Sequence, residues 1–274
     1  MKARAMISPW SATAFNQVPD SANEIHGDTL AKDYGFAGGL VPGVTVSAYL
    51  AHPAVEAWGP GWLGRGAAHV RVTSPLYDGE EFGVRITSQS SKAYSAELVR
   101  GESIVSANAQ VWLTDTLPQA PSRRGDPIFQ ADYVGPQACV EHWSRLQQQG
   151  CHAVRYRWGD DNPMRVYLSD ESRMPRLLQS SGGGYANLSF ILGISNWVLA
   201  SNAYMNPWVH LETTSQNFAP IPRGTVIVAE MQVTDFYEKK GHEFVDVEVA
   251  LYDERGDACL TTIALRAIYK LRGA

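Results

Sequence analysis

Two stretches of the chain decide the fold: Ser74-Pro75-Leu76-Tyr77-Asp78-Gly79 and Phe218-Ala219-Pro220-Ile221-Pro222-Arg223-Gly224. Pro75 and Pro220, and likewise Gly79 and Gly224, lie 145 residues apart (220 − 75 and 224 − 79). One fixed offset shared by two turn residues indicates an internal duplication. The sequence therefore predicts two structurally equivalent halves within its 274 residues.

Each half also repeats one order of elements, judged from hydrophobic patterns and from breaks at Gly, Pro and polar clusters. An almost uncharged helix comes first, at 44–58 and again at 185–203. The strands expected after it are 67–74, 82–88, 94–99 and 104–113 in the first half, and 209–218, 226–236, 243–252 and 259–271 in the second. Because such apolar helices have to be covered, we expect an α+β fold in which each antiparallel sheet wraps around a long buried helix.

A proline-rich segment separates the halves. Residues 115–136 contain Pro118, Pro121, Pro127 and Pro136, which break regular structure. We interpret this segment as a linker between a first half at 1–114 and a second half at 137–274. A short amphipathic helix, 137–149, is expected to open the second half.

The segment before the first buried helix carries the functional signal. It reads Ser21-Ala22-Asn23-Glu24-Ile25-His26-Gly27-Asp28 and, further on, Gly38-Gly39-Leu40-Val41-Pro42-Gly43. This segment resembles the hydratase motif of the MaoC-like, (R)-specific enoyl-CoA hydratase family, in which an Asp-x-Asn-(Pro)-x-His run precedes a glycine at the start of a buried helix. The family's catalytic Asp falls on Ser21. With its duplicated element order, the chain resembles the tandem, or double, hotdog members of the superfamily over nearly its whole length.

The same residues have a physical logic of their own. Hydration of an unsaturated thioester needs proton transfer and fixed dipoles at the developing enolate oxygen. His26 titrates near neutral pH and is the candidate acid and base. Gly43 and Val44 open a helix whose unpaired amides are candidate oxyanion donors. Asn23 offers an amide for water or substrate.

Simpler interpretations of these residues stay open. His26 followed by Gly27 fits an ordinary surface loop, and Gly38-Gly39 fits a plain turn. Asp28 is either the N-cap of a short helix or a partner that orients the imidazole of His26. The second half contains no counterpart of Asn23 and His26, which predicts one active site per chain, with the second half forming a wall of the acyl tunnel.

Three functional interpretations follow. The first is a hydratase or dehydratase (a carbon-oxygen lyase) that acts on an acyl-CoA or related activated acyl compound, with His26, Asn23 and Ser21 as catalytic residues. Loss of the family's Asp at Ser21 removes a base whose contribution is on the order of 10²–10⁴ in rate, so catalysis would rest on His26. The second is an acyl-CoA thioesterase of the same fold, and the third is a non-catalytic acyl-binding module.

Composition and charge limit the classes of partner that the protein is expected to bind. The formal net charge is −5 and no basic run occurs, which argues against nucleic acid. Three widely spaced cysteines indicate a reduced compartment. No signal peptide or bilayer-spanning run is apparent, so we expect a cytoplasmic protein with no membrane contact. The other histidines show no metal-binding spacing, and His69 and His210 are expected to pack on strands. Neither a metal nor a cofactor is predicted, and the chain is expected to be a monomeric pseudo-dimer or a homodimer.

Overall fold

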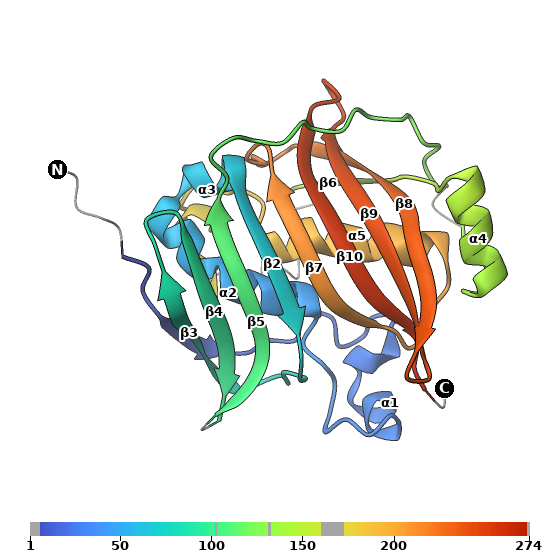
Figure 1. Ribbon diagram of the computed structural model, residues 1–274, viewed down its shortest axis with the longest axis horizontal. Coiled ribbons are helices and arrows are strands. Elements are labelled where there is room, and N and C mark those ends of the chain that lie inside the picture. Colours follow the sequence, from blue (N-terminus) through green and yellow to red (C-terminus); the bar gives the residue numbers. More distant parts are fainter. Residues whose placement is uncertain (1–5, 102, 131–132, 160–172, 273–274) are drawn as a thin grey trace.

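Strands β2 (Gly66–Val72) and β7 (Val209–Asn217) pair at the centre of the molecule and join the two halves into one sheet. The computed structural model describes residues 6–101, 103–130, 133–159 and 173–272. Within them the strands form a ten-stranded antiparallel sheet in the order β1-β3-β4-β5-β2-β7-β10-β9-β8-β6 (Figure 1). The remaining strands are β1 (Trp10–Thr13), β3 (Glu81–Gln89), β4 (Ala93–Arg100), β5 (Ile104–Leu113), β6 (Val154–Arg157), β8 (Val226–Lys239), β9 (His242–Asp253) and β10 (Cys259–Lys270).

The strand order is the same in both halves when it is followed outward from the centre. One side reads β2-β5-β4-β3-β1 and the other reads β7-β10-β9-β8-β6. Each strand therefore has an equivalent five elements later in the strand numbering, which confirms the duplication inferred from the offset of 145 residues.

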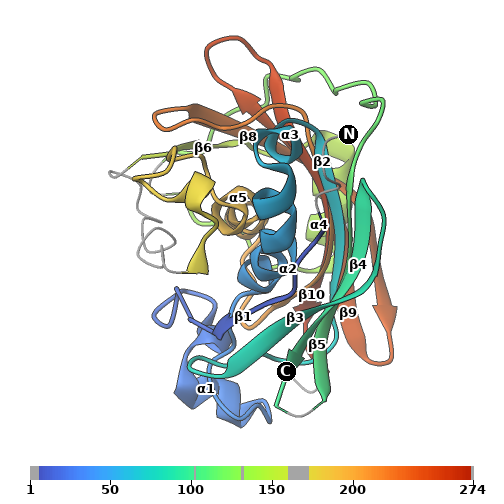
Figure 2. The same cartoon turned by 90° about the vertical axis from the view of Figure 1, so that its left-hand side faces the viewer.

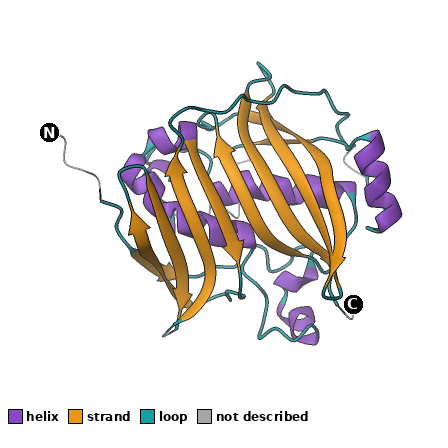
Figure 3. Ribbon diagram, viewed as in Figure 1, coloured by secondary structure: helices purple, strands orange, loops and turns teal. Residues whose placement is uncertain are grey.

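Two long helices lie side by side on one face of the curved sheet (Figures 2 and 3). Helix α2 (Gly43–Trp58) begins one residue before its predicted start at 44. Helix α5 (Leu188–Asn202) begins three residues after its predicted start at 185. The later start of α5 reflects its cap, since the side chain of Asn187 accepts from the amide of Phe190. The first residues of the two helices are again 145 apart (188 − 43), so their N-termini are equivalent positions.

Shorter elements complete the fold. They are η1 (Glu24–His26), α1 (Asp28–Asp33), α3 (Pro60–Arg65), α4 (Val140–Gln149) and η4 (Arg176–Leu178). Helix α4 was predicted from the sequence, whereas α3 and the edge strands β1 and β6 were not. Each of these edge strands has only four residues, too few for an alternating pattern to stand out.

The linker crosses the sheet in an irregular path between β5 and α4 (Figure 1). The amides of Arg124, Gly125 and Asp126 donate to the carboxylate of Glu230 on β8, at 2.7 to 3.0 Å. Glu230 is fully buried, and these three hydrogen bonds give both oxygens of its carboxylate a partner. The linker is therefore attached to the second half of the sheet.

No helix among the described residues has the length and apolar character needed to cross a membrane. Residues 160–172, which contain much of the segment that precedes α5 and corresponds to the His26 segment, lie outside the described residues.

Candidate active site

A small hydrophobic cluster holds the His26 segment in place. Ile25, Ala31 and Leu40 are buried together, and the amide of Leu40 donates to the carbonyl of Ile25 over 3.1 Å. Gly39 permits this approach, because a Cβ atom on it would lie 2.1 Å from the carbonyl oxygen of His26. Gly39 therefore has a packing role beyond that of a plain turn residue.

A main-chain bond fixes the tautomer of the His26 imidazole. Nδ1 lies 2.7 Å from the carbonyl oxygen of Leu40, and a carbonyl only accepts, so Nδ1 carries the proton of the neutral ring. Nε2 then presents a lone pair, and it has no hydrogen-bond partner in the described part of the chain. Burial lowers the pKa of His26 below its ordinary value of 6.5, and the Leu40 bond opposes this only in part. At neutral pH His26 is therefore an uncharged base.

His26 and the N-terminus of α2 line the same cavity. Its volume is about 40 Å³, and His26, Asn23 and Gly43 are among the residues that surround it. The amides of Gly43 and Val44 have no acceptor among the described residues, as the first turn of a helix leaves them unpaired. A cavity of this size has room for about two or three water-sized groups. A helix N-terminus is also a favourable place for an oxyanion.

The second half contributes two polar side chains to this cavity, Asn196 on α5 and His210 on β7. Nδ1 of His210 lies 2.8 Å from Oδ1 of Asn196, and Nε2 is bonded to the hydroxyl of Thr213. Burial lowers the pKa of His210 to about 3, so its ring stays neutral. Because Oδ1 of Asn196 only accepts, Nδ1 of His210 donates, and the NH₂ group of Asn196 is left available as a donor.

The sequence did not predict a place for Asn196 in this cavity, and it predicted only a packing role for His210. His210 does pack closely, since a Cβ atom on Gly43 would lie 3.0 Å from its Cδ2 atom. The available signal for Asn196 was a carboxamide in the middle of an uncharged helix, where a partly buried polar group calls for a partner. Its link to His26 could not be foreseen, because the two residues are separated by most of the chain.

Asn23 and Ser21 make bonds that close the loop around the cavity. The side-chain carboxamide of Asn23 makes two hydrogen bonds to the main chain of Trp208. Its NH₂ group donates to the carbonyl over 2.9 Å, and its oxygen accepts from the N–H over 3.2 Å. The hydroxyl of Ser21 donates to the carbonyl of Asn23 over 2.9 Å. Asn23 thus connects the His26 segment to the second half, while Ser21 is not among the residues that line the cavity.

Asp28 and Val44 lie next to the cavity without lining it. Asp28 is the first residue of α1 and not its cap, which is Gly27. The Asp28 carboxylate accepts from the amide of Gly39 over 2.8 Å, and the imidazole of His26 is oriented by a carbonyl instead. The side chain of Val44 is completely buried.

The described residues that line the cavity include no carboxylate and no metal-ligand cluster. No Asp or Glu is among the described residues that line the cavity. Within the described ranges, no three His, Cys, Asp or Glu side chains converge closely enough to hold a metal ion.

Comparison with known proteins extends the fold assignment. No protein-family model and no curated protein matches the sequence. The structure is similar to that of a protein named as a MaoC-domain dehydratase from Chloroflexus aurantiacus, with a TM-score of 0.55, 11% identity and coverage of 96% of this chain and 94% of that one.

Two further solved structures are similar to the same extent. One is named as a thioesterase from Novosphingobium aromaticivorans, with a TM-score of 0.52, 14% identity and 98% of both chains covered. The other is Rv0216 from Mycobacterium tuberculosis, described as a double hotdog, with a TM-score of 0.51, 12% identity and coverage of 97% of this chain and 96% of that one. The predicted α+β double hotdog fold is confirmed.

Proposed function

We propose that this protein is a hydratase or dehydratase that acts on an acyl-CoA or related acyl thioester in the cavity between His26 and α2. One observation carries the proposal: a neutral imidazole with an unpaired Nε2 lines the same cavity as the unpaired amide of Gly43. Addition of water to an α,β-unsaturated thioester requires a base that activates the water and a donor that stabilises the enolate oxygen. Both groups lie around one small space here.

In the hydration direction, Nε2 of His26 accepts a proton from water as the water oxygen bonds to the β-carbon. The electron pair of the double bond moves toward the thioester, which places negative charge on its oxygen. The imidazolium then returns the proton to the α-carbon. His26 thus ends the cycle neutral, and the elements of one water molecule have been added. Dehydration follows the same steps in reverse.

The amides of Gly43 and Val44 and the NH₂ group of Asn196 would stabilise the enolate oxygen. Donors held in place before the reaction are worth more than mobile water, because they need no reorganisation when the charge develops. His210 keeps the carboxamide of Asn196 in position through the 2.8 Å bond to Oδ1. Asn23 would act by holding the His26 segment against Trp208.

A thioesterase is the second candidate, and a specific observation favours it. The cavity has no acidic side chain among its described lining residues, and hydrolysis does not require a second acid at the α-carbon. In that reaction His26 would activate water for attack on the thioester carbon, and the same donors would stabilise the tetrahedral oxyanion.

Both activities should be assayed with wild type and with His26→Ala. Crotonyl-CoA hydration is measured by loss of the enoyl absorbance, and acyl-CoA hydrolysis is measured by release of free thiol. We expect hydration in the wild type that is lost in the variant. Hydrolysis lost in the variant would instead support the thioesterase. Activity of either kind that persists in His26→Ala would remove His26 from the mechanism, and ligand binding with neither activity would favour an acyl-binding module.

A further inference from the structure

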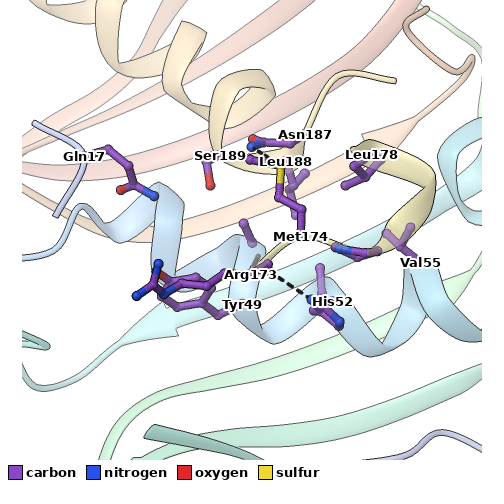
Figure 4. Close-up of a pocket in the computed structure, with 13 residues that line it drawn as sticks. Gln17, Tyr49, His52, Val55, Arg173, Met174, Leu178, Asn187, Leu188 and Ser189 are labelled. Carbon is purple, nitrogen blue, oxygen red and sulfur yellow. Dashed lines mark hydrogen bonds between the residues drawn. The ribbon is translucent and has the colours of Figure 1, made fainter. Parts of the chain in front are cut away.

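A second cavity lies at the N-terminus of α5, the position equivalent to the His26 cavity. It has a volume of about 30 Å³ and lies between α2, η4 and the first turn of α5 (Figure 4). The first residues of α2 and α5 are 145 apart (188 − 43). The two cavities are therefore related by the internal duplication.

Gln17 places an unpaired donor in this second cavity. The residue is 4% exposed, and its Oε1 accepts from the hydroxyl of Thr45 over 2.7 Å. Its Nε2 has no partner among the described residues, and Figure 4 shows the amide nitrogen on the side of the cavity. An acceptor that fills this space would therefore give the Gln17 donor a partner.

Ser189 and the start of α5 add further donors. Ser189 is 3% exposed, and its hydroxyl has no partner in the described part of the chain. The amides of Leu188 and Ser189 have no acceptor there either, as expected in the first turn of a helix. All these groups belong to residues that line the second cavity.

The charge around the second cavity matches these donors. Arg173 lines it and donates to the carbonyl of Thr13, with its guanidinium 5.5 Å from the ring centre of Phe15. No Asp or Glu is among the described lining residues. Donors, a helix N-terminus and one cation, with no acid among the described lining residues, favour an anion.

We propose that the second cavity binds a carboxylate group. A space of about 30 Å³ holds about two water-sized groups, which suits the two oxygens of a carboxylate. The carboxylate belongs either to a free small acid or to the far end of an acyl substrate whose thioester lies at His26. The second source rests on the proposed function, whereas the binding site itself does not.

Acetate is the probe that tests this site. Binding of ¹³C-labelled acetate to the full chain is titrated by NMR, without any thioester, for wild type and for Gln17→Glu. The substitution keeps an oxygen for Thr45 and replaces the donor by a negatively charged acceptor. We expect acetate affinity to fall at least tenfold. Gln148→Glu makes the same change on the exposed face of α4 and should leave the affinity unchanged.

Two more variants separate the second cavity from the His26 cavity. His26→Ala should bind acetate like the wild type even if it has lost all turnover, so failure of the proposed function would not affect this test. The proposal is overturned if the wild type does not bind acetate, or if Gln17→Glu binds it as well as the wild type does. It is also overturned if binding is lost in Asn196→Ala but not in Gln17→Glu.

Competition distinguishes the two sources of the carboxylate. An enoyl-CoA with a carboxylate at the end of its acyl chain should displace acetate if the substrate supplies the group. The enoyl-CoA of equal length that ends in a methyl group is the control and should not displace it. If neither compound displaces acetate, the site binds a free acid.

Discussion

The N-termini of α2 and α5 occupy equivalent positions, yet different side chains surround them. Both helices leave unpaired amides in a small cavity. At α2 these amides meet His26, which can move a proton, whereas at α5 they meet Gln17, which can only donate hydrogen bonds. The duplicated scaffold therefore supplies unpaired helix amides twice, and among the described residues the side chain beside them is His26 at α2 and Gln17 at α5. Under the proposed function, this difference separates a cavity that catalyses from one that only binds.

Replacing His26 should have the largest effect on the difference between the two cavities. His26→Gln would give the α2 cavity an amide in place of an imidazole, as at α5. We expect kcat to fall about 10²- to 10⁴-fold, the usual contribution of general acid–base catalysis, with a much smaller effect on KM. His69→Gln, on the exposed part of β2, is the matched control. A variant His26→Gln with wild-type kcat would contradict the assigned difference between the cavities.

Asn196 is the residue of the second half that we propose as an oxyanion donor in the α2 cavity. Its replacement in Asn196→Ala should lower kcat about 10²- to 10³-fold, the effect seen when one oxyanion donor is removed. Steady-state kinetics and a thermal unfolding curve measured together separate this from a loss of folded protein. If the loss of activity is explained by a loss of folded protein, so that kcat per folded molecule is unchanged, Asn196 has a structural role only.

Gly39 is expected to control how closely the His26 segment approaches α2. In Gly39→Ala the new methyl group would meet the His26 carbonyl oxygen, which is main chain and cannot swing aside. We expect a loss of about 1–3 kcal/mol in the free energy of unfolding, measured by denaturant titration. In Gly38→Ala the nearest atom is a carboxylate oxygen of Asp28 at 3.1 Å, which can move. Similar losses in the two variants would show that the Gly39 contact does not limit the fold.

Stability should depend on pH through His210. Its pKa is about 3 in the folded protein and near 6.5 when unfolded, so the unfolded chain binds the proton first as the pH falls. The free energy of unfolding should therefore have its full value above pH 6.5. It should decrease as the pH falls toward 3, by up to about 1.4 kcal/mol per pH unit from this group. His210→Gln should flatten that slope, and an unchanged slope would mean that His210 does not titrate as its burial implies.

How much the sequence could predict varies between the fold and the site. The apolar helices, eight strands and the offset of 145 residues were accessible, because hydrophobic periodicity and duplication are local patterns. The short strands β1 and β6 were not. His26 and Gly43 line one cavity, and their catalytic roles stay a prediction. Asn196 and His210 reach this cavity only through the pairing of β2 with β7. Sequence spacing also cannot show that both polar groups of Asn23 are taken up by Trp208.

The account is tested most directly by a crystal structure of the protein with a non-reactive thioether analogue of crotonyl-CoA that keeps a carbonyl group. We predict that the carbonyl oxygen lies within hydrogen-bond distance of the Gly43 amide and that the β-carbon faces Nε2 of His26. A ligand bound at the α5 cavity or on the outer face of the sheet, with the space beside His26 left to water, would contradict the claim that the α2 cavity is the active site.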